Sequence, residues 1–279
     1  MRRWAVAGKI ANTQVEIIRE VERGHIRHVL FDFDGTLSLI RDGWQDVMVP
    51  LMVEVLEATG TDEPRDKIER CVIEYVDRLT GKQTIYQMMR LADEVTKRGG
   101  TPLDPLEYKA EYYRRLQPLV DARIAELRGG AVRREDLLLP GSLAMIEGIR
   151  ERGASLYLAS GTDEQYVHEE AAVLEVAGYF DGGIFGAVKE YKTFSKALVI
   201  QRIFQQQDLH GPALLVVGDG FVEIENGRDV GAITLGIYSE EHNRYHMNAD
   251  KRRRLLDAGA DLLAPDFRDH AALLDYLFP

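Results

Sequence analysis

The chain has 279 residues, of which 45% are hydrophobic and 29% charged, a composition that indicates a soluble globular protein and excludes a disordered one. Its 46 acidic and 35 basic residues give a net charge of −11, which disfavours lasting contact with nucleic acid or an anionic membrane. The sequence has neither the roughly 20 consecutive apolar residues that span a bilayer nor the apolar core of a signal peptide, so we expect a cytoplasmic protein.

Residues 1–27 contain one amphipathic pattern, in which Val15, Ile18 and Val21 predict a short helix without evident function. Further along, continuous apolar runs that end in Gly, Asp or Ser predict buried parallel strands. The four clear runs are 28–35, 154–161, 213–220 and 232–239, with a weaker strand at 182–187 and a possible edge strand at 260–267.

Helical patterns alternate with these strands. One spans 142–152, and Ser195 is placed to cap another that carries Leu198, Val199 and Ile203 on its apolar face. Strand–helix alternation of this kind predicts an α/β fold with an open, Rossmann-like parallel sheet.

A different pattern occupies residues 41–139, where apolar residues recur only at helical spacing, for example at Trp44, Val47, Met48 and Leu51. We therefore expect a helical domain at 41–139, inserted into a core built from residues 1–40 and 140–279. Its expected borders are the loop at 38–42 and the segment at 139–141.

The first strand ends in the segment FDFDGT, which carries Asp32 and Asp34. If the strand continued, both carboxylates would lie on one face, since side chains alternate with a period of two. Two anions that close repel each other unless a cation neutralises them, and Mg²⁺ suits such an oxygen-rich pair. One carboxylate could then attack phosphorus while the other moves protons.

The second strand ends at Ser160, Gly161 and Thr162. A hydroxyl followed by glycine at a strand-to-helix turn offers an O–H and backbone N–H groups to an anion, although the same tripeptide also forms ordinary turns and helix caps.

A third strand ends in Gly218-Asp219-Gly220, followed by Glu223. Asp219 is a candidate metal ligand, and Glu223 either binds the metal or orients its water ligands. Lys196 opens the preceding helix and can bring a positive charge to the same edge of the sheet, where ligands of open α/β sheets bind.

Taken together, these motifs resemble those of the haloacid dehalogenase superfamily, the phosphatases that use an aspartate nucleophile. The resemblance implies that Asp32 forms an aspartyl-phosphate and that Asp34 protonates the leaving oxygen and later activates water. It also implies that Ser160, Gly161 and Lys196 bind phosphate, and that Mg²⁺ is held by Asp32, the backbone carbonyl of Asp34, and Asp219.

Two features depart from the family pattern. The second acidic residue after Gly-Asp is usually aspartate but is Glu223 here, which leaves open whether it contacts the metal directly. Lys189 and Lys192 compete with Lys196 for the role of the phosphate-site lysine; Lys196 is preferred because an apolar helical run continues from it.

The insertion at 41–139 resembles the family's helical cap, which closes over the site and selects the substrate. Arg41 and Trp44 lie just past its expected hinge, and Lys82 lies in the loop 80–84 between two helical patterns. These three residues are the candidates for substrate contact. The basic run 251–254 is interpreted as surface charge.

We therefore expect Mg²⁺-dependent hydrolysis of a small phosphorylated metabolite through a phospho-aspartyl intermediate on Asp32, without nucleic acid or membrane partners. A phosphotransferase or sugar-phosphate mutase with the same first half-reaction is the alternative. Halide displacement is disfavoured, because it needs neither Asp34 nor Asp219. Phosphonate cleavage would require Lys82 as a Schiff base, and a binding protein without turnover would be expected to lack one of the motifs.

Overall fold

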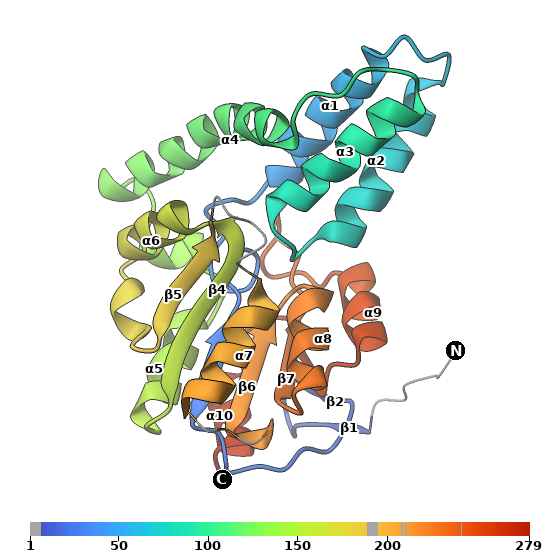
Figure 1. Ribbon diagram of the computed structural model, residues 1–279. Helices are drawn as coiled ribbons and strands as arrows, with labels where there is room; N and C mark the ends of the chain where they lie inside the picture. The colour runs from blue at the N-terminus through green and yellow to red at the C-terminus, as the bar shows by residue number, and fades with distance from the viewer. Residues whose placement is uncertain (1–6, 189–194, 208, 210, 241) are drawn as a thin grey trace.

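The computed structural model describes residues 7–188, 195–207, 209, 211–240 and 242–279, and its centre is a mostly parallel sheet of eight strands in the order β1-β2-β8-β7-β6-β3-β4-β5 (Figure 1). The strands are β1 (Gly8–Lys9), β2 (Glu16–Ile17), β3 (His28–Phe31), β4 (Ser155–Asp163), β5 (Gly183–Ala187), β6 (Leu214–Gly218), β7 (Ile233–Ile237) and β8 (Leu262–Ala264). From β8 to β5 all neighbours are parallel, so the predicted α/β class with a Rossmann-like sheet is confirmed.

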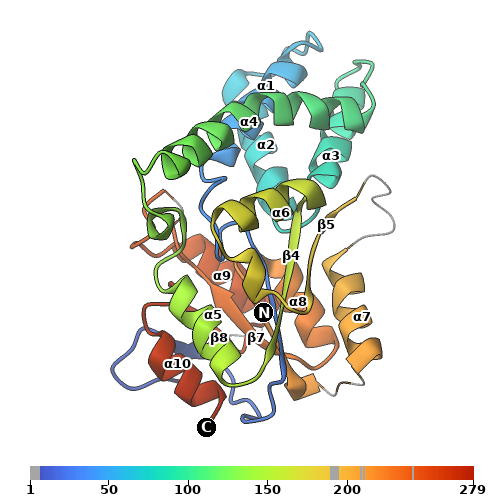
Figure 2. The ribbon, with the colours of Figure 1, turned by 90° about the vertical axis from the view of Figure 1, so that its left-hand side faces the viewer.

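Helices cover both faces of the sheet, because its central strands are apolar on both sides. Val29 and Phe31 of β3 belong to a core shared with α5 (Ser142–Glu151) and α10 (His270–Leu277), whereas Leu30 packs with α7 (Lys196–Gln207) on the opposite face. Figure 2 shows α5 and α10 on one side of the sheet and α7 on the other. The helices α6 (Glu164–Val173), α8 (Phe221–Asp229) and α9 (Ala249–Ala258) complete the two layers.

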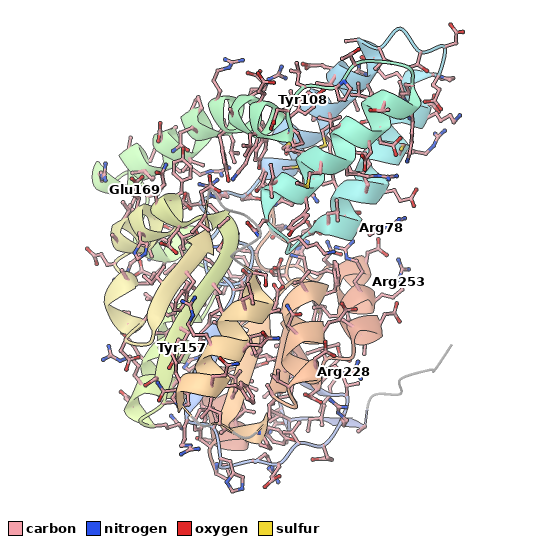
Figure 3. The ribbon with its side chains drawn as sticks, in the orientation of Figure 1. Arg78, Tyr108, Tyr157, Glu169, Arg228 and Arg253 are labelled. Atoms are coloured by element: carbon pink, nitrogen blue, oxygen red, sulfur yellow. The ribbon has the colours of Figure 1, made fainter. Side chains whose placement is uncertain are left out.

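The outer surfaces of these helices carry charged side chains, as Figure 3 shows for Arg253 of α9. Single 3₁₀ turns lie at Arg134–Leu137, Ala177–Tyr179 and Gly211–Ala213. At the start of α7, the Oγ of Ser195 accepts a hydrogen bond of 3.1 Å from the backbone N–H of Leu198, as expected for a capping serine.

The helix predicted around Val15, Ile18 and Val21 is wrong. This segment forms the short strands β1 and β2, and β2 pairs antiparallel with β8. Consequently β8 lies inside the sheet, and the prediction that it forms an edge is also wrong. Val15 and Ile18 are buried in the folded core, which is a long-range contact that local spacing does not report.

Four helices occupy the chain between β3 and α5: α1 (Trp44–Glu57), α2 (Arg65–Leu79), α3 (Thr84–Lys97) and α4 (Pro105–Arg128). The first three form a bundle beyond the carboxyl ends of the strands, and α4 runs from this bundle toward α6 (Figure 1). A reciprocal capping box begins α4: the Asp104 side chain accepts a hydrogen bond from the backbone N–H of Leu106, and the Glu107 side chain accepts one from the backbone N–H of Asp104. We call α1–α4 the helical insertion.

The connections between the insertion and the sheet lie side by side, since Ser38 pairs with Leu138 in an isolated bridge. Among the helices of the described ranges, none is both long enough and apolar enough for a bilayer crossing.

Candidate active site

The two aspartates at the end of β3 face different partners. The strand ends at Phe31 and the chain turns at Gly35, whose φ of 75° is left-handed, so the carboxylates do not share one face as a continued strand would require. Asp32 points toward Lys196, whereas one oxygen of Asp34 accepts hydrogen bonds from Ser160 Oγ at 2.8 Å and Thr162 Oγ1 at 2.9 Å. The two side chains are therefore held separately.

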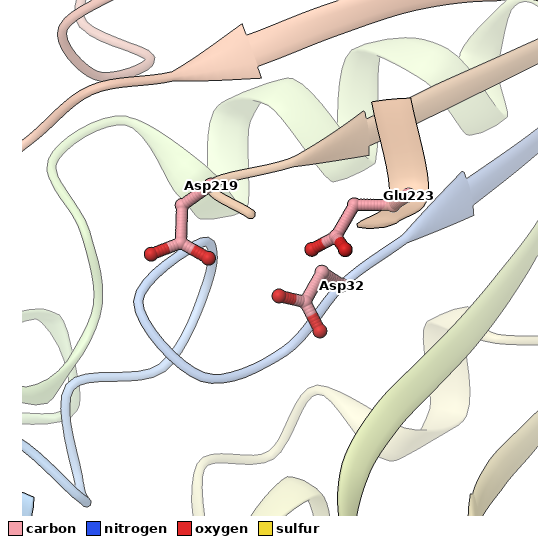
Figure 4. Close-up of side chains that lie close together, drawn as sticks. All are labelled: Asp32, Asp219 and Glu223. Atoms are coloured by element: carbon pink, nitrogen blue, oxygen red, sulfur yellow. The ribbon is translucent and has the colours of Figure 1, made fainter. Parts of the chain in front are cut away.

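A buried cluster of carboxylates surrounds Asp32. The side chains of Asp32, Asp219 and Glu223 each offer an oxygen within 4.8 Å of the others (Figure 4). They come from the ends of β3 and β6 and the first turn of α8, which meet at one edge of the sheet as expected for an open α/β fold. In this arrangement all three carboxylates converge on one point.

Lys196 joins two members of this cluster. Its Nζ donates to Asp32 at 2.7 Å and to Glu223 at 3.0 Å, and all three side chains are buried. Burial alone would lower the pKa of the lysine, but the charges of Asp32 and Glu223 raise it above its usual value, so the ammonium stays charged. The preference for Lys196 agrees with this geometry; Lys189 and Lys192 lie outside the described residues.

The electrostatic balance of the cluster favours a further cation. Burial raises the pKa of the Asp32 carboxyl well above its ordinary value; Lys196 lowers it, and Glu223 and Asp219 raise it again. Glu223 Oε2 is buried without a hydrogen-bond partner among the described residues. Converging carboxylate oxygens with an unpaired lone pair suit a hard divalent ion, so the donor set fits Mg²⁺.

A second lysine at the cluster was missed. Lys251 lies on α9, is buried, and donates to Asp219 Oδ2 at 2.7 Å. The interpretation of residues 251–254 as surface charge is therefore wrong for Lys251, although Arg253 points outward and is exposed (Figure 3). Buried and exposed positions of a helix are distinguished in a sequence by the spacing of apolar and charged residues. Four consecutive basic residues show no such spacing, so the sequence does not indicate that Lys251 is buried.

The carboxyl end of β4, where the pairing with β5 is irregular between Ala159 and Asp163, contacts both the aspartate site and the insertion. Besides donating to Asp34, Ser160 Oγ accepts from the backbone N–H of Thr162 at 3.0 Å. Gly161 faces the backbone of Lys82, in the loop between α2 and α3. Of the loop predicted at 80–84, residues 80–83 lie between the helices and Thr84 already begins α3; this loop lies against the segment expected to bind phosphate.

Arg41, which the sequence predicts to contact substrate, forms a buried ion pair with Glu170 that the sequence does not predict. Its Nη2 donates to Glu170 Oε1 at 2.6 Å, its Nε donates to both oxygens of Glu170, and its Nε lies 3.9 Å from Asp34 Oδ1. Burial raises the pKa of Glu170 to about 7 even though Arg41 opposes the shift. Glu170 itself was missed, because a glutamate on α6 has no local signal that distinguishes it from its exposed neighbour Glu169.

One cavity joins these groups. It measures about 90 Å³ and lies between the carboxyl ends of the strands and the helical insertion. The three predicted substrate residues, Arg41, Trp44 and Lys82, all line it. Its other lining residues are Asp32, Asp34, Met48, Thr80, Gly81, Thr84, Gln87, Tyr112, Tyr113, Ser160, Gly161, Thr162, Lys196 and Asp219.

The sequence profile of a family described as haloacid dehalogenase-like hydrolase matches residues 26–231, which is more than half of the chain. The chain belongs to this hydrolase family. Its match begins just before β3 and extends past Asp219 and Glu223, so it includes the whole carboxylate cluster.

Solved structures share the fold of this family member at low sequence identity. A phosphonoacetaldehyde hydrolase-like protein from Oleispira antarctica is 14% identical with a TM-score of 0.61, covering 93% of this chain and 95% of its own. A predicted phosphoglycolate phosphatase from Haemophilus somnus is 16% identical with a TM-score of 0.57, and the match covers 89% of this chain and 98% of that protein. A β-phosphoglucomutase from Clostridium difficile is 12% identical with a TM-score of 0.57, and the match covers 88% of this chain and 92% of that protein. No curated protein matches the chain.

Proposed function

We propose that this hydrolase cleaves a small phosphomonoester with the help of Mg²⁺, through a phospho-aspartyl intermediate on Asp32. The observation that carries the proposal is the separation of two carboxylates at one cavity. Asp32 is fixed by Lys196 among metal-binding groups, while Asp34 is held by the hydroxyls of Ser160 and Thr162. A nucleophile and an acid–base group need such different environments.

In the first step a carboxylate oxygen of Asp32 attacks phosphorus and forms an aspartyl-phosphate, while the ester P–O bond breaks. Asp34 transfers its proton to the departing oxygen. In the second step Asp34 takes a proton from water, whose oxygen attacks the same phosphorus. The acyl-phosphate P–O bond breaks, and Asp32 and inorganic phosphate are released. Lys196 offsets negative charge on the transferring oxygens.

Asp32 and Asp219 would hold the Mg²⁺ ion, together with the backbone carbonyl of Asp34. When bound, this ion neutralises charge on the phosphoryl oxygens. Glu223 would offer the ion its Oε2, which has no partner among the described residues, while its Oε1 accepts from Lys196 and from the backbone N–H of Gly220 and so fixes the side chain. The helical insertion, lying over the cavity, would serve as the cap that excludes water.

The test is hydrolysis of p-nitrophenyl phosphate with Mg²⁺ by the intact chain and by Asp32→Asn. We expect the substitution to lower kcat by at least about a thousand-fold, because the neutral amide does not attack phosphorus. Asp46→Asn is the matched control, since the Asp46 side chain is 76% exposed. Full activity in a purified Asp32→Asn protein with unchanged circular dichroism would refute the proposal.

The same reaction mixture distinguishes the phosphotransferase or mutase alternative, in which a hydroxyl replaces water in the second step. Phosphorus NMR reads free phosphate directly, and we expect it to account for the substrate consumed. An isomerised sugar phosphate in place of free phosphate would favour the alternative.

A further inference from the structure

Outside the aspartate site, the polar groups that face the cavity are one buried ion pair, the exposed Lys82 and uncharged side chains. Arg41 donates three hydrogen bonds from Nε and Nη2 to Glu170, which balances its positive charge once the pH is above the Glu170 pKa of about 7. Within the described residues, the remaining nitrogen Nη1 has no hydrogen-bond partner, and Arg41 lines the cavity. The guanidinium therefore presents a fixed donor edge rather than an uncompensated positive charge.

Two uncharged polar side chains of the helical insertion line the same space. Gln87 of α3 is only 4% exposed and has no side-chain hydrogen bond to a described residue. Tyr113 of α4 also lines the cavity, and its buried hydroxyl forms no well-aligned hydrogen bond within the described ranges, although Thr84 and the backbone of Asp163 lie beside it. Because a buried polar group without a well-aligned partner is costly, the Tyr113 hydroxyl is suited to a hydrogen bond with a bound molecule, and the Gln87 amide, which lines the cavity, can form another.

Apolar surface completes this part of the cavity, in the form of Trp44, Met48 and Tyr112. Flat aromatic surface beside fixed neutral donors and acceptors suits a small molecule with C–H faces and hydroxyl groups. The volume of about 90 Å³ is well below the roughly 300 Å³ at which sites for drug-sized ligands begin, so the molecule must be small.

The remaining charges decide between a neutral and an acidic leaving group. Asp32, Asp34 and Asp219 line the cavity, and a second anion on the substrate would face them. Lys196 and Arg41 are already paired with carboxylates. Lys82 lines the cavity too, but its side chain is exposed, so solvent screens its charge.

Resting on the proposed function, we propose that the substrate is the phosphate ester of a small, uncharged polyhydroxy compound, whose hydroxyl groups bind Arg41, Gln87 and Tyr113. Glu170 is a positioning residue that holds the donor edge of Arg41 toward the leaving group.

Three esters of similar size test this assignment in the intact protein with Mg²⁺. Glycerol 3-phosphate carries hydroxyl groups, 3-phosphoglycerate carries a carboxylate, and n-propyl phosphate carries neither. We expect kcat/KM for glycerol 3-phosphate to exceed that for each of the others by about ten-fold or more, because the polar groups of the site stay unpaired with n-propyl phosphate and the carboxylates repel 3-phosphoglycerate.

Gln87→Leu tests the role of the cavity directly, with Gln201→Leu on the exposed face of α7 as the matched control. We expect Gln87→Leu to reduce the ratio of kcat/KM for glycerol 3-phosphate over n-propyl phosphate by about five- to ten-fold, and the control to leave that ratio unchanged.

A preference for 3-phosphoglycerate, equal use of glycerol 3-phosphate and n-propyl phosphate, or an unaltered ratio in Gln87→Leu would overturn the assignment. So would hydrolysis of p-nitrophenyl phosphate without any hydrolysis of glycerol 3-phosphate. In all these cases the proposed function would stand. Failure of the intact protein to hydrolyse p-nitrophenyl phosphate would refute both proposals together.

Discussion

The backbone of Gly161 packs against the backbone of Lys82, so that a methyl group at Gly161 would lie 2.6 Å from the Lys82 carbonyl oxygen. One residue belongs to the carboxyl end of β4 and the other to the helical insertion. Since a Cβ atom does not approach another atom this closely, the insertion reaches its position over the cavity only because residue 161 lacks a side chain.

Gly161→Ala is therefore expected to displace the loop at residues 80–83 from the carboxyl end of β4. A shift of about 1 Å costs on the order of a hundred-fold in rate where reacting groups must be aligned, so we expect kcat/KM for p-nitrophenyl phosphate to fall by about that factor. Gly178→Ala is the control, because an added methyl group there meets no atom within 4 Å. Equal activity of the two variants would show that the contact does not position the insertion.

Asp34→Asn separates acid catalysis from nucleophilic attack. An alkoxide leaving group needs a proton from Asp34, whereas p-nitrophenolate departs without one. We expect kcat to fall by about 10²–10⁴-fold for an alkyl phosphate and by clearly less for p-nitrophenyl phosphate. Steady-state kinetics of both substrates provide the measurement, and an equal loss on both would argue against Asp34 as the acid.

Lys251→Met removes a positive charge that contacts the candidate metal ligand Asp219. Two positive charges a few Å apart repel by at least about 1–2 kcal/mol even in a water-like dielectric, so we expect Mg²⁺ to bind about ten-fold more tightly to the variant. Isothermal titration calorimetry measures this without turnover. Arg253→Met, on the exposed side of the same helix, should leave the affinity unchanged. Weaker binding in Lys251→Met would mean that the lysine mainly holds Asp219 in place.

Glu170 should make stability depend on pH. Burial raises the pKa of this carboxyl from 4.5 to about 7, so between these values the folded state retains a proton that the unfolded chain releases. The contribution is fully present below about pH 4.5 and is lost as the pH rises to about 7, by up to about 3 kcal/mol in the free energy of unfolding.

Urea unfolding of the intact chain and of Glu170→Gln at pH 5 and pH 7.5 measures this loss. The variant cannot titrate at this position, and its stability should fall less over the same range. Glu169→Gln, at the exposed neighbouring residue, serves as the control. Identical pH dependence in all three proteins would rule out Glu170 as the source.

The strands around the site could be predicted because their signal is local. A buried parallel strand is a continuous apolar run, and residues such as Asp32 and Asp219 follow directly from where each run ends. The two-residue strands β1 and β2 have no such signal. Val15 and Ile18 fit helical spacing, and only pairing with β8, about 245 residues later, decides their conformation.

The charged residues around the site were also only partly predictable from the sequence. Lys196 was found because it opens a helix immediately before a recognisable strand. Lys251 and Glu170 were missed because each is defined by its partner, Asp219 or Arg41, which lies on a distant element. Burial of a charged residue is a property of the assembled fold, so a single sequence read locally does not distinguish it from a charge in solvent.

The position of the helical insertion also bears on how the protein folds. Residues of β3 pair with residues of β4 about 127 positions later, which makes this central pairing about 1 kcal/mol more costly in loop-closure entropy than an ordinary 30-residue crossover. The insertion is built from helices, whose contacts are local and form fast. If it folds first, the bridge between Ser38 and Leu138 brings the two ends of the long loop together, and β4 then has only a short path to its partner. The element that lies over the finished site would thus also guide the assembly of the sheet beneath it.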